Sequence, residues 1–101
     1  MNKDDVFSVV RYLDIKHMSN DEIQTLIKCF ENKTEEFYRL KYTGQIFNQP
    51  SAENVFITGK DVYDIVNNLD LKIFSFRELI SLLDLFKIKS RQMQEELSKR
   101  S

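Results

Sequence analysis

Apolar residues recur along the chain at intervals of three and four, the spacing that places them on one face of an α-helix. Four segments carry this pattern, which predicts helices over 4–13, from 20 to about 42–47, over 59–68 and over 76–98. The polar stretch 48–54 holds the single proline and predicts a loop. The short apolar segment 55–58 after it is expected to be locally extended.

Clear helix start signals support these boundaries. Ser19 and Glu22 form a capping box, in which the hydroxyl accepts a first-turn N–H and the Glu side chain reaches back to the cap. Ser75 and Glu78 repeat this arrangement, and Thr58 is a weaker start signal for the third helix. The end of the second helix stays open, because Gly44 either ends the helix or is a close-packing position inside it.

The last predicted helix is apolar on nearly every side of its first half. Leu79, Leu82 and Phe86 form one stripe, and Ile80, Leu83, Leu85 and Ile88 widen it. A helix of this kind is buried on several sides. Either the other three helices cover it or a partner does, and we expect a partner surface.

The composition agrees with one helical domain over 1–101. A β-sandwich or barrel needs many turns, and two Gly and one Pro are too few to supply them. A hydrophobic fraction of 42% with eight Phe is too high for a disordered chain. We therefore expect an all-α fold with one modest core.

Charge and reactive residues exclude several function classes. The formal net charge of −1 is not that of a protein that coats phosphates. Cys29 and His17 are the only cysteine and histidine, so no disulfide, metal cluster or nucleophile with its base and orienting partner is expected. We predict no enzyme activity and no cofactor.

The expected localisation is intracellular. Acidic residues interrupt 1–16, which therefore does not have the pattern of a signal peptide, and no apolar run has membrane-spanning length.

The chain also resembles itself. When 5–33 is set over 61–89 without gaps, eleven of the 29 pairs are identical. The identical pairs include Val10/Val66, Leu13/Leu69, Ser19/Ser75, Glu22/Glu78, Leu26/Leu82 and Phe30/Phe86. Either a duplication or a strong shared structural role explains them, or any two units of a short and a long helix share caps and apolar positions. Both explanations predict the same local structure twice.

Two stretches resemble the histone-fold family. Residues 9–19 resemble the end of its first helix and the loop before its long helix, and residues 54–62 resemble its second loop and the start of its third helix. The resemblance covers 4–69, with 70–101 as a C-terminal helix. It is greatest to non-nucleosomal members such as TBP-associated factors and Spt3-like subunits, and it implies a short-long-short order of helices.

The resemblance implies a dimer with another histone-fold chain, as hetero- or homodimer, with an architectural role in a transcription or chromatin complex of the nucleus. The residues predicted for the partner interface are Ile23, Leu26, Ile27, Phe30, Phe37, Leu40, Val62, Ile65, Val66, Leu79, Leu83 and Phe86. Contact with DNA is expected to be weak at most. The basic residues that would make it are Lys16, His17, Lys60, Lys87, Lys89 and Arg91.

A second interpretation fits the internal similarity better. Two tandem helical hairpins could form a four-helix bundle, which would act as a small adaptor or inhibitor, viral or bacterial, that binds a protein partner in the cytoplasm. The second helix discriminates between the two. A helix continuous through Gly44 favours the histone fold, and a break there favours two hairpins.

Overall fold

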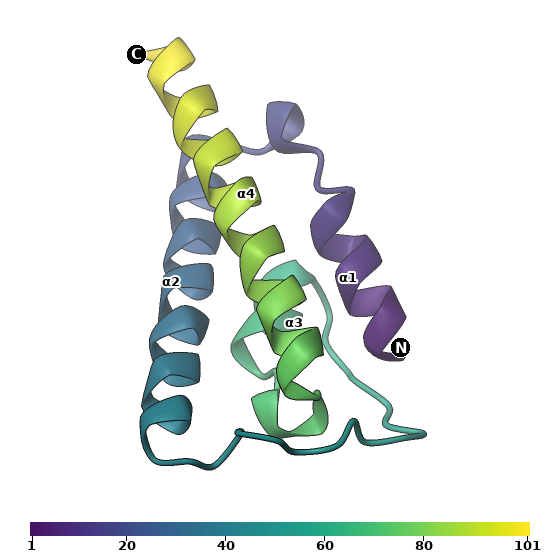
Figure 1. Ribbon diagram of the computed structural model, residues 1–101. Helices are drawn as coiled ribbons and strands as arrows, with labels where there is room; N and C mark the ends of the chain where they lie inside the picture. Colours follow the sequence, from purple (N-terminus) through teal and green to yellow (C-terminus); the bar gives the residue numbers. More distant parts are fainter.

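The computed structural model describes residues 1–101 and contains helices but no strand (Figure 1). The predicted all-α fold, with a short-long-short order and a C-terminal fourth helix, is confirmed. The α-helices are α1 (Lys3–Arg11), α2 (Asn20–Tyr42), α3 (Val62–Asn67) and α4 (Phe76–Arg100). Two 3-10 turns, η1 (Ile15–His17) and η2 (Leu71–Ile73), precede the long helices.

Both predicted capping boxes are present. The Ser19 hydroxyl accepts the N–H of Glu22 at 3.1 Å, and the Ser19 N–H donates to the Glu22 carboxylate at 2.9 Å. Ser75 and Glu78 make the same two bonds at 3.1 and 2.8 Å. Each box satisfies donors that the first turn of a long helix leaves without an intrahelical partner.

The two short helices begin differently from the prediction. Asn2 starts α1 with a capping box of its own, which the sequence pattern had not indicated. The prediction that the third helix starts at 59 under Thr58 is wrong. Its cap is Asp61, whose carboxylate accepts the N–H of Asp64 at 3.0 Å, so the helix starts at Val62.

The second helix ends before Gly44. Thr43 is its last partly helical residue, and Gly44 has a φ of +73°, the left-handed conformation that follows many helices. The Gly44 N–H donates to the Lys41 carbonyl at 3.1 Å, and the Gln45 N–H donates to the Leu40 carbonyl at 2.9 Å. This pair of bonds is a Schellman motif, so the chain leaves the helix here and α2 is not continuous through Gly44.

The long helices α2 and α4 lie side by side and run in opposite directions (Figure 1). The short helix α1 packs on α4, α3 packs on α2, and α1 and α3 touch each other. Each short helix therefore packs on the long helix that follows the other short helix. The two helical units interlock, which the tandem-hairpin interpretation did not require.

The same elements recur in the two halves of the chain, as the internal similarity predicts. The turn Ile15–His17 corresponds to Leu71–Ile73 in that alignment, and the cap Ser19 corresponds to Ser75. The long helices are antiparallel, and each short helix packs on the long helix of the other unit. The two units are therefore related by an approximate twofold axis. The expectation of one local structure present twice is confirmed.

Equivalent carbonyls of the two turns are also satisfied in the same way. The Arg100 guanidinium donates to the carbonyls of Ile15 at 3.3 Å and Met18 at 2.8 Å. The Gln49 amide donates to the corresponding carbonyls of Leu71 at 3.4 Å and Phe74 at 2.6 Å. In each case the donor lies at or beyond the end of the long helix of the other unit.

The core is one continuous apolar cluster drawn from all four helices and from the α2–α3 and α3–α4 connections. Ile46 and Ile57 come from the first of these connections, and Leu69, Leu71 and Phe74 come from the second. Segment 55–58 is not a strand, although Ile57 exchanges two backbone hydrogen bonds with Met1 at 2.7 and 2.9 Å. Lys33 is buried and stays paired, because its ammonium donates to the Leu69 carbonyl at 2.7 Å and to Glu36 at 2.9 Å.

Candidate protein-binding face

The apolar residues predicted for a partner interface lie in the core of the single chain. Eight of the twelve are buried: Ile23, Leu26, Phe30, Phe37, Ile65, Val66, Leu79 and Phe86. The other four pack against the core and are half-buried: Ile27, Leu40, Val62 and Leu83. A partner could reach the buried eight only if the chain opened, so the surface it could contact lies elsewhere.

The physical reason is the position of α4. Phe86 stacks on Phe30 with ring centroids 4.4 Å apart and ring planes 10° from parallel. The apolar side of α2 that was assigned to a partner is covered by α4 of the same chain. Helix α4, in turn, is covered by α1 and α2, so its core stripe needs no second chain.

Four exposed side chains on α2 form one stripe. Glu31, Glu35, Tyr38 and Tyr42 are exposed and are separated by four, three and four residues, so they lie one above another on the helix. Helix α3 packs on a different side of α2, where Lys33 bonds to the α3–η2 connection. No part of the chain covers this stripe.

Helix α4 has a matching exposed stripe. Ile80, Lys87, Arg91 and Gln94 are separated by seven, four and three residues and are all exposed. The side of α4 toward α1 is a different one, where Glu78 lies 3.6 Å from the ammonium of Lys3. We call the two exposed stripes, together with the groove between them, the α2–α4 face.

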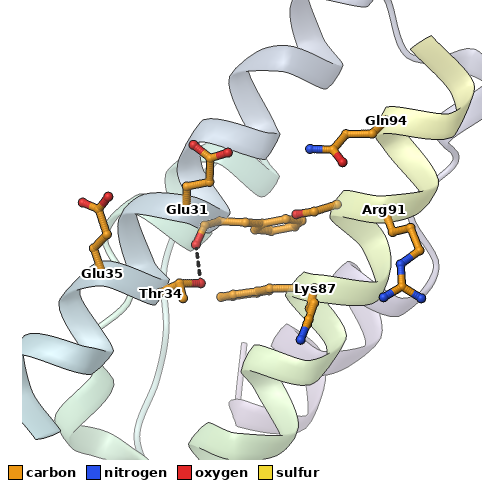
Figure 2. Close-up of a pocket in the computed structure, with 9 residues that line it drawn as sticks. Glu31, Thr34, Glu35, Lys87, Arg91 and Gln94 are labelled. Atoms are coloured by element: carbon orange, nitrogen blue, oxygen red, sulfur yellow. Dashed lines mark hydrogen bonds between the residues drawn. The ribbon is translucent and has the colours of Figure 1, made fainter. Parts of the chain in front are cut away.

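A groove of about 460 Å³ runs between α2 and α4 (Figure 2). The stacked rings of Phe30 and Phe86 form its floor. Its rim is polar: the Thr34 hydroxyl donates to the Phe30 carbonyl at 2.9 Å, and Ser90 lies at the equivalent position on α4. The groove is shallow, since both rings are at most 1% exposed.

Opposite charges line the two sides of this groove. Glu31 and Glu35 on α2 lie across from Lys87 and Arg91 on α4 (Figure 2). None of the four makes an ion pair within the chain. The alignment of the two units relates Glu31 to Lys87, and the same shift continued two residues past its end relates Glu35 to Arg91, so equivalent positions carry opposite charge.

One end of the face is aromatic. Tyr38 is 51% exposed, Tyr42 90% and Phe47 61%. The Phe47 ring packs edge-on against Phe76, the first residue of α4, with centroids 5.8 Å apart. Phe76 also lies 5.9 Å from the buried ring of Phe37. The Tyr38 ring also packs edge-on against Phe37, so the rings of Phe47 and Tyr38 continue into the core.

The basic residues proposed for DNA contact do not form one surface. Lys87 and Arg91 share the groove, opposite two carboxylates, and Lys89 does not line it. Lys16 on η1 lies in a shallow pocket with Glu95. The remaining two, His17 and Lys60, lie on η1 and in the loop before α3.

The reactive residues have structural surroundings. Burial raises the pKa of the Cys29 thiol, and the side chain is only 4% exposed. Exposed His17 lies on η1 with its Nδ1 2.7 Å from the Asp14 carboxylate. No three His, Cys, Asp or Glu side chains lie together in a metal-binding arrangement. No helix combines the length and the apolar character that crossing a membrane requires.

The sequence interpretation did not single out the aromatic end of this face. Tyr38 and Tyr42 continue the stripe of Glu31 and Glu35, so helical spacing alone could have grouped them. The internal similarity held a second signal. With the same shift continued beyond the aligned range, position 38 corresponds to Gln94, so the two units agree at core positions such as Phe30 and differ along the exposed stripe.

Comparison with known proteins adds no relative. No protein-family model, no curated protein and no solved structure matches this chain. The function is therefore inferred from the chain's own geometry.

Proposed function

We propose that this chain is a non-enzymatic helical module that binds a protein partner through the α2–α4 face. The observation that carries the proposal is the combination of exposed aromatic side chains and unpaired charges on a side of the long helices that no other element covers. Aromatic and Arg side chains are the residues most enriched at the energetically dominant positions of protein interfaces.

The aromatic end supplies the apolar part of such an interface. Tyr42 is almost fully exposed, and a Tyr side chain offers a large, rigid contact area with few rotatable bonds. The charged groove supplies orientation, since a partner must present basic groups to Glu31 and acidic groups to Lys87. An interface of this kind has an apolar centre with polar groups around it.

The adaptor role is better supported than a histone-fold role. Two observations favour the adaptor role: α2 ends before Gly44, and Phe30 is buried under α4 of the same chain. A histone-like pairing with another chain, in a transcription or chromatin complex of the nucleus, needs an open apolar side on the long helix. In this chain that side is already filled.

A photo-crosslinking amino acid placed in the full chain in cells tests the proposal. At Tyr42 it should give an adduct of defined mass, whereas at Tyr12 it should give none. Tyr12 is a matched control, because it is 77% exposed and lies outside the α2–α4 face. Equal crosslinking at both positions, or none at either, would overturn the proposed face.

A further inference from the structure

The α2–α4 face has three features whose arrangement points to one partner. Its α2 side is acidic at Glu31 and Glu35, and its α4 side is basic at Lys87 and Arg91. Its apolar groups gather at one end only, where α2 finishes and α4 begins. A partner must therefore present basic groups to the α2 side, acidic groups to the α4 side and apolar groups to this end.

We propose that the partner is a second copy of this chain, bound face to face about a twofold axis parallel to α2 and α4. This inference rests on the proposed function and names the occupant of the same face. Closed twofold dimers are the most common assemblies of identical chains, and they require a surface that is complementary to itself. The α2–α4 face meets that requirement in both its charges and its apolar end.

The charges match because this axis exchanges the two helices. A half-turn about it lays α2 against α4 of the partner subunit. Phe30 stacks on Phe86, so the residues next to them, Glu31 and Lys87, lie at the same level along the helices. Glu31 therefore meets Lys87 of the partner subunit, and the contact occurs twice. Glu35 and Arg91 lie about one turn to either side and add to the attraction.

The apolar ends match because the same axis keeps every residue at its level. The end of α2 with Tyr38 and Tyr42 comes to lie beside the start of α4 of the partner subunit, since Phe76 and Ile80 occupy that level in each copy. Exposed apolar groups of both copies are then removed from water together. The polar end, with Gln94, meets the polar end of the second copy.

The alternative face-to-face arrangement is disfavoured by charge. A twofold axis that lies in the interface but runs across the helices lays α2 on α2 and α4 on α4. Glu31 and Glu35 would then face carboxylates, and Lys87 and Arg91 would face cations. Like charges brought together in an interface are repulsive, so the parallel axis is selected.

The area is adequate for a dimer. Helices of 23 and 25 residues are each about 35 Å long, and two packed helices about 10 Å apart present a face roughly 20 Å wide. That gives about 700 Å² on each copy, close to the roughly 800 Å² per partner of a standard stable interface.

Sedimentation equilibrium of the full chain at micromolar to millimolar concentration tests the proposal. The chain should form a dimer, and Glu31→Lys or Lys87→Glu should each weaken it by about tenfold or more through like-charge contacts. An equimolar mixture of these two variants should regain a dimer as tight as the parent's. In the mixed pair both contacts between positions 31 and 87 are attractive, because one copy carries Lys at both positions and the other carries Glu at both.

Control variants test whether the effects are specific to this face or follow from any change of surface charge or exposed aromatic area. Glu95→Lys reverses an exposed charge on α4 outside the face, and Tyr12→Ser removes an exposed ring outside it; both should leave the dimer unchanged. Tyr42→Ser should weaken it. Circular dichroism should show each variant folded, because the substituted side chains are exposed.

Several results would overturn the second copy as the partner. They are a monomer over the whole concentration range, a dimer insensitive to Glu31→Lys and Tyr42→Ser, and failure of the mixed variants to pair. If the chain is a monomer and Tyr42 still crosslinks in cells to a protein of another mass, the face binds a different protein. In that case the proposed function stands and the homodimer is wrong.

Discussion

Phe30 and Phe86 lie far apart in the sequence, occupy equivalent positions in the two helical units, and stack on each other with their centroids 4.4 Å apart. Two equivalent residues can contact each other in this way only where the axis that relates the units passes between them. The stacked pair therefore marks the approximate twofold axis of the chain. It is also where α2 and α4 bury the apolar stripes that neither helix could leave in water.

Truncation of one ring should remove a large part of the free energy of unfolding. Phe30→Ala removes a side chain that is 1% exposed and leaves a cavity beside Phe86, at a cost of about 3–5 kcal/mol. The total free energy of unfolding of a small domain is about 5–15 kcal/mol. Urea unfolding followed by circular dichroism measures the loss. Glu35→Ala, exposed on the same helix, should change the free energy of unfolding by less than about 0.5 kcal/mol. Equal midpoints for the two variants would contradict the assignment of Phe30 to the core.

Gly44→Ala should destabilise the chain by about 1–2 kcal/mol. The cause is the φ of +73°, because a Cβ at this position would meet no other atom within 4 Å. Gly44→Asn is the matched variant, since Asn tolerates the left-handed conformation better than Ala. Thermal melts should rank the parent above the Asn variant and the Asn variant above the Ala variant. An Ala variant as stable as the parent would mean that α2 continues through this position.

Stability should fall in acid partly through Glu78. Burial alone would raise the pKa of this carboxyl, but hydrogen bonds from Ser75 and Ser51 and the charge of Lys3 outweigh burial and hold the pKa below its ordinary value. The unfolded chain then takes up this proton at a higher pH than the folded chain does. The contribution of Glu78 is therefore complete above the unfolded value of about 4.3 and is lost as the pH falls through the lower folded pKa.

Melting temperatures of the parent and of Glu78→Gln across this pH range test the assignment. The difference between the two should be largest near neutral pH and should shrink as the pH falls below about 4. Glu53→Gln, in an exposed loop, should follow the parent at every pH. A Glu78→Gln variant whose melting temperature falls as steeply as the parent's would show that another group governs the acid transition.

Nucleic acid should bind weakly and only at low salt. Glu31 and Glu35 lie across the groove from Lys87 and Arg91, and the formal net charge is −1, so little phosphate can be neutralised. Binding to a duplex, followed by fluorescence anisotropy, should disappear between about 50 and 200 mM salt. A tight complex at the higher salt concentration would require a basic surface that the chain does not have.

The parts of this fold that the sequence predicted are those that depend on local interactions. A capping box joins residues three apart, so Ser19 with Glu22 and Ser75 with Glu78 identified the starts of the long helices. Helical spacing likewise identified the core stripe around Phe30. The start of α3 was misread because Thr58 and Asp61 are both acceptable caps, and only the tertiary structure selects between them.

The sequence by itself determined that the chain is helical, where its long helices begin, and that the same helical unit occurs twice. Each of these depends on local patterns of residues a few positions apart. Only the tertiary structure decided what covers the apolar stripe of α2. The pattern of apolar residues around Phe30 is the same whether the helix that covers it belongs to the other half of the chain or to another chain. The tethered helix is present at a high effective concentration, and the structure places its Phe86 on Phe30. The same packing left Tyr38, Tyr42 and the charged groove uncovered, and so defined the face on which the proposed function depends.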